Sequence, residues 1–583
     1  MFKNLFQLKK YFVRYKKAFV LGIIFIFLSN IGQVYIPQLI KQGINAISLH
    51  ASGNQVLKYV ILITITSLIA GVFRFMIRQT IIVTSWKIAN DLRYDFWNHL
   101  QKLPLRFYQN NSTGNIMSHA TNDINAVRSF VGPSVMYTID NGTKFLLVFF
   151  IMLSMNPLLT LYALLPSPIM SFLVYFVMSR VHAKYTKIQE KFADLTSRAQ
   201  ENFSGIRVIK SYNREEYEIE NYKIESKEYL KRKMDLVKLQ ALFIPVFSMI
   251  AGLSFIIVLW AGGTQMISGT FSIGELVAFY AYLGMLIWPM ISFGWVATMV
   301  QQAEASMKRL LKIFNEPYEI QDSTETNYDI KKIDGEIEFK NVSFRYGENL
   351  PWILNKINLK IYKGNTVAFI GKTGTGKTSL VNLIPRFYDP TEGEVLIDGI
   401  NVKNIPLETL RKNIGIVSQE NFLFSDTLAN NVTYGLSDNS ETVIHKSAEI
   451  AQLSKDVENF PKGFDTILGE RGITLSGGQK QRTTLARALA IDPKILILDD
   501  SFSAVDTNTE EEILRRLKEF MKNRTSIIIS HRISTVKDAD KIFVLHDGKI
   551  AEEGTHQQLI ELNGIYADIN KRQLLEQELS IMD

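Results

Sequence analysis

Cysteine is absent from this 583-residue chain, which excludes disulfide bonds, thiolate zinc sites and cysteine nucleophiles. Histidine is sparse, with eight scattered residues, and no pair has the H-E-x-x-H spacing of a zinc-binding helix. A cleavable leader is not evident either. Basic residues precede the first apolar run, but residues 18–40 are too long for a leader and lack a small-x-small cleavage site. We therefore expect this run to stay as a first membrane span.

A single basic face is the next feature that the chain lacks. The formal net charge is +8, yet Lys and Arg crowd the segments beside the apolar runs. This distribution is the positive-inside bias of a membrane protein. We expect the lipid bilayer as a partner and no nucleic acid.

Long apolar runs dominate the first half of the chain. Six of them approach the roughly 20 residues needed to cross a bilayer. They cover residues 18–40, 56–80, 131–155, 157–180, 241–267 and 273–300. A tight turn at Asn156-Pro157 separates the third and fourth runs, and residues 268–272 separate the fifth and sixth.

An even number of spans places both termini on one side of the membrane. The N-terminal tail and residues 180–238 are rich in Lys and Arg, whereas the two short turns have none. We therefore expect a multi-pass protein of the cytoplasmic (inner) cell membrane with both termini in the cytoplasm. The two long cytoplasmic loops are charged and poor in proline, so we expect spans that continue as helices beyond the membrane.

Composition divides the chain into three parts. Residues 1–305 carry the apolar runs, residues 306–335 form a polar linker, and residues 336–583 read as a soluble α/β domain. That domain opens with residues 337–342, whose apolar and polar side chains alternate as in a strand. The predicted fold class is an α-helical transmembrane domain of six spans fused to an α/β phosphate-loop domain.

Two opposite charges lie within the third apolar run. Asp140 and Lys144 are four residues apart, so they share one helix face. They either neutralise each other or line a cavity for a substrate, and the sequence leaves both interpretations open.

The soluble part contains a phosphate-binding loop. The run G-K-T-G-T-G-K-T fits G-x-x-x-x-G-K-[ST] without a mismatch, between an apolar strand-like run at 367–370 and a helix-like run at 379–384. The glycines let backbone N–H groups converge on phosphate oxygens, and the helix start adds its positive dipole end. The lysine neutralises the β- and γ-phosphates, and the final threonine ligates Mg²⁺. The predicted ATP-binding residues are Gly371, Lys372, Thr373, Gly374, Thr375, Gly376, Lys377, Thr378 and Ser379.

An acidic residue ends a second apolar run. Residues 495–498 are four consecutive apolar residues, as in a strand buried on both faces, and Asp499 follows them. Together with the phosphate loop, this placement predicts that Asp499 holds Mg²⁺ through water.

A short motif before this strand resembles a known family. Leu475, Ser476, Gly477, Gly478 and Gln479 spell L-S-G-G-Q, which looks like the signature of ATP-binding cassette (ABC) transporters. The resemblance covers essentially the whole chain, because six spans followed by one cassette is the half-size exporter layout.

Further positions match the family pattern in order. Tyr346 resembles the aromatic residue that stacks on adenine, and Gln419 resembles the glutamine that links Mg²⁺ to the membrane domain. Ser503 and Asp506 resemble the loop that contacts the partner cassette, and His531 resembles the switch histidine. The remaining matches are the exporter motif at 469–472 and a first coupling loop at 103–127.

The signature also implies a dimer. Its serine and glycines form a second anion site at a helix start, which cannot reach the phosphate loop of the same domain. Two cassettes therefore sandwich two ATP molecules head to tail, and each signature closes the other's site. A second half-transporter is the expected partner.

One residue departs from the family pattern. Most such cassettes have glutamate after the Mg²⁺ aspartate, where it is proposed to position the attacking water, but here the residue is Asp500. The side chain is one methylene shorter, so we expect an impaired site in which Asp500, Lys377 and His531 are the catalytic candidates. This pattern is similar to one half of heterodimeric multidrug-type exporters; a homodimer stays open, because His531 is intact.

The resemblance implies ATP-driven export of a small amphipathic molecule (drug-like, lipid or peptide) by alternating access, with ATP and Mg²⁺ as cofactors. A flippase for lipids or lipid-linked precursors uses the same scaffold and is the first alternative. An ATP-gated channel or a regulatory half of a heterodimer is the second. The sequence does not reveal the substrate.

Overall fold

The computed structural model describes residues 3–438, 440–469, 472, 475–503 and 507–582. They form two compact units. One comprises Met1–His99 and Thr113–Glu316, and the other comprises Leu100–Ser112 and Pro317–Asp583. The predicted division at 305 and 335 stays a prediction, but α13 continues to Phe314, so the polar stretch begins as helix.

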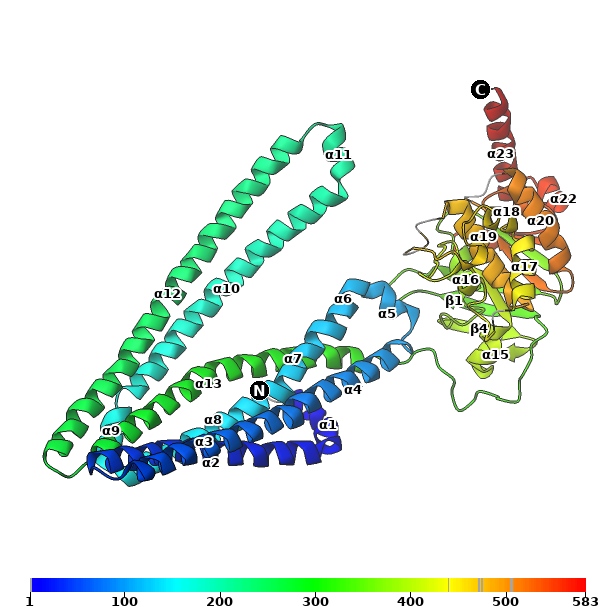
Figure 1. Cartoon of the computed structure of the whole chain (residues 1–583). Helices are drawn as coiled ribbons and strands as arrows, with labels where there is room; N and C mark the ends of the chain where they lie inside the picture. Colours follow the sequence, from blue (N-terminus) through cyan, green and yellow to red (C-terminus); the bar gives the residue numbers. More distant parts are fainter. Residues whose placement is uncertain (1–2, 439, 470–471, 473–474, 504–506, 583) are drawn as a thin grey trace. The chain divides into compact units, whose positions relative to one another are not determined.

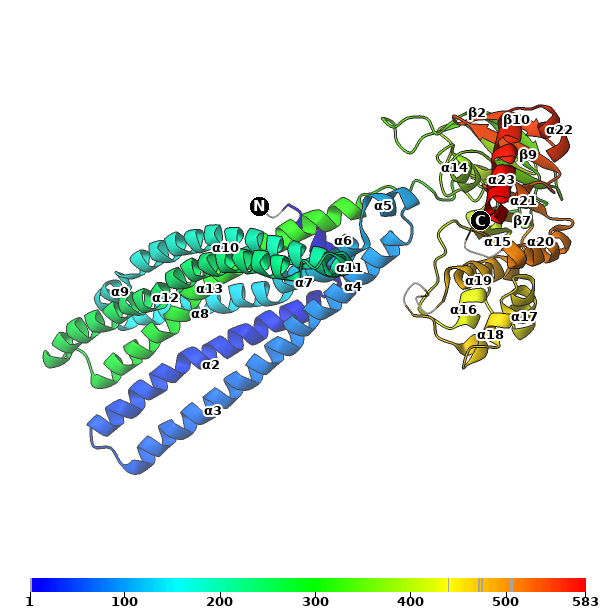
Figure 2. The ribbon, with the colours of Figure 1, turned by 90° about the horizontal axis from the view of Figure 1, so that it is seen from above.

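The first unit is entirely helical in its described part, and the chain doubles back on itself several times (Figures 1 and 2). Its α-helices are α1 Lys9–Arg14, α2 Lys16–Ser48, α3 Gly53–Ile77, α4 Val83–Leu100, α6 Thr113–Ser118, α7 Ile124–Ser129, α8 Val135–Met155, α9 Pro157–Leu164, α10 Ser167–Ser204, α11 Ile206–Ser211, α12 Glu215–Ile267 and α13 Ile273–Phe314. Short π-helical stretches join α3 to α4, α6 to α7 and α7 to α8. Helices α10 and α12 lie side by side, and α11 connects their far ends (Figures 1 and 2).

Five helices of the described residues are long and apolar enough to cross a membrane. Counted across the π-helical stretches, these continuous helices are Lys16–Ser48, Gly53–Leu100, Thr113–Met155, Glu215–Ile267 and Ile273–Phe314. Each contains one of the six predicted spans and extends beyond it, as expected for spans that continue as helices. The predicted span at 157–180 is instead divided between α9 and α10. The break lies at Leu165 and Pro166, because proline has no N–H for the helical ladder and disfavours helix at the residue before it.

A close approach between α2 and α13 helps to hold the first unit together. A Cβ atom on Gly274 would lie 2.3 Å from the carbonyl oxygen of Lys41 and 2.4 Å from Oδ1 of Asn45, so only glycine fits. The N–H of Gly274 donates to Asn45 Oδ1 at 3.0 Å. Lys41 pairs with Glu275 at 3.0 Å, and Glu275 also completes a capping box with Ser272.

The second unit is an α/β fold with two sheets. The smaller sheet has the order β2-β1-β4-β5 and is antiparallel. Its strands are β1 Ile337–Phe344, β2 Leu354–Ile361, β4 Glu392–Ile397 and β5 Ile400–Asn401. The larger sheet has the order β10-β9-β3-β8-β7-β6, and it is parallel except for β10. Its strands are β3 Thr366–Ile370, β6 Ile414–Val417, β7 Ile495–Asp499, β8 Thr525–Ile529, β9 Lys541–His546 and β10 Lys549–Gly554.

The larger sheet is covered on both faces. Alternate residues of β7 enter different cores: Leu496 and Leu498 face one, and Ile495 and Ile497 face the other. This explains why the predicted strand reads as an uninterrupted apolar run. The helices of this unit are α5 Leu105–Asn110, α14 Lys377–Asn382, α15 Leu407–Lys412, α16 Leu428–Val432, α17 Glu441–Ile450, α18 Ser454–Val457, α19 Gly477–Ala490, α20 Thr507–Met521, α21 Ile533–Val536, α22 His556–Glu561 and α23 Ile565–Met582.

The substitution Gly274→Ala tests the α2–α13 contact. We expect a lower melting temperature of the purified protein, corresponding to about 1–3 kcal/mol, because the methyl group overlaps the Lys41 carbonyl. Gly284→Ala is the matched control on α13, where an added Cβ meets nothing within 4 Å. Equal melting temperatures for the two variants would contradict the close approach.

Candidate nucleotide-binding site

The phosphate loop joins β3 to α14 and depends on glycine at two positions. Gly371 has φ +155°, and its Cβ would lie 2.3 Å from the carbonyl oxygen of Leu545. Gly376 precedes α14 with φ +97°, and its Cβ would lie 3.0 Å from the carbonyl oxygen of Ile353. A side chain at either position would displace backbone, so the glycines fix the path of the loop.

Lys377 begins α14 with its ammonium folded onto the loop. Its Nζ donates to the carbonyl oxygens of Gly371 and Lys372 at 2.8 and 2.9 Å. Burial lowers the pKa of Lys377, while the nearby carboxylates of Asp499 and Asp500 oppose that shift. A cation is thus held at the centre of a loop whose geometry suits phosphate.

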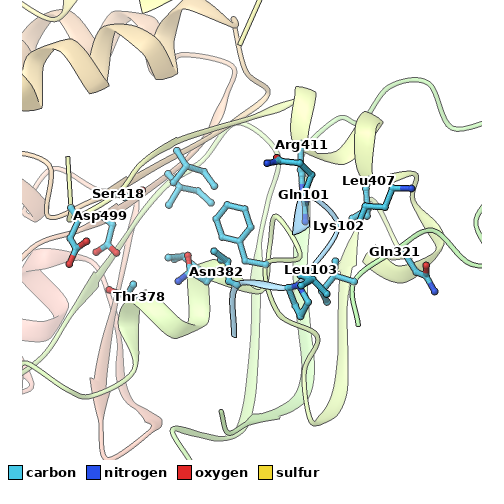
Figure 3. A pocket seen from close by; sticks show the side chains of 18 of the residues that line it. Gln101, Lys102, Leu103, Gln321, Thr378, Asn382, Leu407, Arg411, Ser418 and Asp499 are labelled. Atoms are coloured by element: carbon cyan, nitrogen blue, oxygen red, sulfur yellow. The ribbon is translucent and has the colours of Figure 1, made fainter. Parts of the chain in front are cut away.

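Thr378 and Asp499 meet at one end of a pocket of about 840 Å³ (Figure 3). The side chain of Thr378 is hydrogen-bonded to Asp499, which is only 4% exposed. Burial raises the pKa of Asp499, and the neighbouring Asp500 raises it further, while Thr378, Lys377 and His531 act in the opposite direction. Gln419 lines the same pocket.

These three residues offer a hydroxyl, an amide and a carboxylate oxygen. Oxygen donors of this kind fit Mg²⁺, which binds few protein ligands and keeps several waters. The described residues contain no cluster of three or more His, Cys, Asp or Glu side chains that would form an all-protein metal cage. The donor set thus fits a metal ion that is shared with a nucleotide.

Asp500 directly follows β7 in a left-handed conformation, with φ +49°. Its N–H donates to the carbonyl oxygen of Ile529 at 2.9 Å. Its own carbonyl accepts from Ser503 Oγ at 3.3 Å, and Ser503 Oγ accepts from Gln481 Nε2 at 3.0 Å. The side chain of Asp500 is therefore presented by a backbone that several contacts hold.

Tyr346 belongs to an aromatic cluster beside the loop. Its hydroxyl is hydrogen-bonded to Ser379 Oγ at 2.9 Å, and its ring packs edge-on against Phe344 and Tyr388. Tyr388 was not predicted from the sequence. No local signal marks it, because it joins the cluster only through the fold.

The signature residues start helix α19. Ser476 and Gln479 form a reciprocal capping box, and Gln479 also donates to Asp456 at 3.1 Å. Leu475 is buried, whereas Ser476, Gly477 and Gly478 lie at the surface or close to it. Within the described cassette, no hydrogen bond or ion pair joins residues 475–479 to residues 371–379.

His531 follows β8 and lies close enough to Asp499 to lower the pKa of that carboxyl. The structure therefore gathers Lys377, Thr378, Asp499 and His531 at one edge of the larger sheet. Of the two residues predicted in the dimer-contact loop, Ser503 is described, but Asp506 lies outside the described residues. Glu470 and Arg471 of the exporter motif also lie outside them.

The intramembrane pair predicted for a substrate cavity does come together. Lys144 Nζ lies 3.6 Å from Asp140 Oδ2, with both side chains largely buried. The carbonyl oxygen of Asp140 accepts from Asn30 Nδ2 at 3.0 Å, and Asn141 donates to Ser292 at 2.6 Å. This geometry fits mutual neutralisation, and the cavity role stays a prediction.

Two protein-family models match the chain. The model described as the ABC transporter transmembrane region matches residues 19–290, and the ABC transporter model matches residues 354–503. The chain is 32% identical over 576 residues to the multidrug resistance-like ATP-binding protein MdlA of Buchnera aphidicola, covering 98% of this chain and 99% of that one.

Two further similarities extend over most of the chain. It is 35% identical over 493 residues to an ATP-dependent lipid A-core flippase of Syntrophus aciditrophicus, covering 85% of this chain and 82% of that one. Among solved structures, a bacterial Atm1-family ABC exporter with ATP bound matches with a TM-score of 0.80 and 25% identity. That match covers 96% of this chain and 98% of the other.

Replacing Lys377 tests the phosphate site. We expect Lys377→Ala to weaken ATP binding about 10- to 100-fold, because a charge-assisted hydrogen bond contributes about 1.5–3 kcal/mol. Binding of a fluorescent ATP analogue to the purified protein measures the change. Lys363→Ala is the matched control outside the loop, because its exposed side chain pairs with Asp334 at 2.9 Å. A comparable loss in both variants would contradict the assignment.

Proposed function

Because the chain belongs to the ABC transporter family, with the membrane region and the cassette of an exporter on one polypeptide, we propose specific roles for its residues in ATP-driven export. The observation that carries these roles is the convergence of Lys377, Thr378, Asp499 and His531 at the phosphate loop. ATP binding and ATPase activity coupled to transport follow from the family.

Each residue has a physical task in this proposal. The loop amides and Lys377 bind the phosphates, Ser379 supports Tyr346, and Tyr346 stacks on adenine. Thr378, Gln419 and Asp499 hold Mg²⁺, which neutralises phosphate charge when bound. The carboxylate of Asp500 orients the attacking water, and His531 stabilises the transferring phosphoryl group.

The transporter works as a dimer of half-transporters, and we propose that the partner is a different chain. Asp500 supports this, because its side chain is one methylene shorter than glutamate and displaces the carboxylate by about 1 Å. A displacement of that size can slow a reaction by ~10²-fold, so a chain with an impaired site of its own would need a competent site from its partner. Ser476, Gly477 and Gly478 would then complete a competent site on the partner's phosphate loop. We also propose that both termini and the cassette lie in the cytoplasm, which the distribution of Lys and Arg supports.

A lipid is the second candidate substrate. One relative is named a lipid A-core flippase, and the first unit carries a cationic group close enough to Lys144 to interact with it electrostatically. This group is Arg74, whose guanidinium donates to Gln33 Oε1 at 3.2 Å. A cationic side chain within a membrane span would suit the head group of an anionic lipid.

Transport into inside-out membrane vesicles tests the function. We expect ATP-dependent accumulation of an amphipathic dye, with the Lys377→Ala protein as the inactive control. A parallel assay follows labelled phospholipid between leaflets of proteoliposomes. Lipid movement without dye accumulation would favour the flippase. If ATP is hydrolysed but neither dye nor lipid moves, export is contradicted.

Asp500→Glu tests the proposal for the departing residue. We expect ATP turnover of this chain purified alone, where every site carries residue 500 of this chain, to rise by about 10-fold or more, because the longer side chain restores the carboxylate to the water-orienting position. Asp500→Asn is the control that keeps the length and removes the charge, and it is expected to lower turnover further. An unchanged rate for Asp500→Glu would show that side-chain length does not limit hydrolysis.

Purification of the tagged chain from its native membrane tests the partner. We expect a second half-transporter chain in equal amount, identified by mass spectrometry after cross-linking. Recovery of this chain alone, as a stable active dimer, would contradict the heterodimer.

A further inference from the structure

The segment that carries His531 is held by a side chain from the C-terminal helix. Gln573 of α23 donates from Nε2 to the carbonyl oxygen of His531 at 2.5 Å. Its Oε1 accepts from the N–H of Ile533 at 2.8 Å. Because a carbonyl only accepts and a backbone N–H only donates, the orientation of this amide is unambiguous.

One amide group thus fixes the backbone on both sides of Arg532. Ile533 is the first residue of α21, and the N–H groups of a first helical turn have no partner within the helix. Gln573 supplies that partner from outside. The short connection between β8 and α21 therefore depends on α23 for part of its hydrogen bonding.

The same segment is also tied to α20. Arg532 forms an ion pair with Glu510, and Thr535 Oγ1 donates to the other oxygen of Glu510 at 2.7 Å. Glu510 is 3% exposed, so this anchor is buried. Residues 531–535 therefore have an ionic anchor on α20 and an amide anchor on α23. Of these two anchors, the amide is the one that contacts the backbone of His531 itself.

The helix that carries Gln573 is itself well fixed. Glu552 of β10 accepts from the N–H groups of Ile565 and Tyr566 at the start of α23. The ring of Tyr566 is fully buried, and its hydroxyl is hydrogen-bonded to His556 at 2.7 Å. Gln573 follows Tyr566 by about two helical turns, a distance over which a helix transmits position rigidly.

We propose that Gln573 is a positioning residue for ATP hydrolysis, and that it acts by fixing the backbone of His531. This inference rests on the role proposed for His531. Removing the amide frees the peptide units on both sides of Arg532, so the imidazole moves relative to Asp499. A displacement of 1 Å at a reacting group can cost ~10²-fold, and Glu510 still restrains the segment, so we expect a loss of about 10-fold in kcat for Gln573→Ala.

Steady-state ATPase kinetics of the full-length chain, purified alone in lipid nanodiscs so that every site carries its own His531, test this. We expect Gln573→Ala to lower kcat while KM for ATP stays within twofold, because Gln573 contacts neither the phosphate loop nor Tyr346. Gln573→Glu keeps the acceptor for Ile533 but places a carboxylate against the His531 carbonyl, and is expected to lower kcat as well. Arg572→Ala is the matched control, since Arg572 is exposed and forms an ion pair with Asp568 on the same helix at 2.9 Å.

A double-mutant cycle with His531→Ala separates positioning from general stability. We expect the double variant to be no slower than His531→Ala alone, because Gln573 has no further effect once the imidazole is gone. The inference is overturned if the kcat losses of the two variants add in the double variant. It is also overturned if Gln573→Ala has the wild-type kcat while His531→Ala is impaired. A wild-type rate in His531→Ala would instead overturn the role proposed for His531, and this inference with it.

Discussion

The nucleotide site depends on the side-by-side pairing of three parallel strands, β3, β8 and β7. Their register places Phe369 and Asp499 opposite the same residue, Ile529. The chain therefore leaves each strand at one edge of the sheet, into the phosphate loop after β3, Asp500 after β7 and His531 after β8. Because carboxyl ends of parallel strands meet at one edge, residues from three distant parts of the sequence become neighbours. The buried apolar faces of these strands maintain that register, since a slip by one residue would exchange the two faces.

Features encoded by short stretches were predictable from the sequence. The phosphate loop, the strand before it and the strand ending at Asp499 are local patterns, and the structure has all three. Five predicted spans lie in long apolar helices. The break at Pro166 was missed because the mean apolarity of residues 157–180 conceals it. The helical character of 306–314 was missed because polar residues mask the spacing of Met307, Leu310 and Ile313, which face inward.

Contacts made by the fold were beyond the reach of sequence patterns. Tyr388 and Gln573 act through residues far from them in the chain, and neither belongs to a recognisable motif. An isolated Gln on an amphipathic helix has no property that separates it from a solvent-facing Gln. Only the position of α23 against the start of α21 gives that amide two backbone partners.

The backbone at Asp500 links the two halves of ATP recognition within one cassette. Asp500 has a left-handed backbone conformation, which aspartate adopts more readily than longer side chains do. The backbone at this position therefore favours aspartate, whereas the proposed water-orienting role favours the longer glutamate. The carbonyl of Asp500 is bonded to Ser503, and Ser503 to Gln481 on the helix that begins with the signature. In the proposed dimer, a signature that closes on a partner's nucleotide would therefore act on the same short segment that carries Asp500. These contacts involve the carbonyl of residue 500 and not its side chain, so aspartate at this position keeps them while slowing hydrolysis in the proposed scheme. A cassette of this kind would hold ATP at its own phosphate loop and still respond to turnover at its partner's.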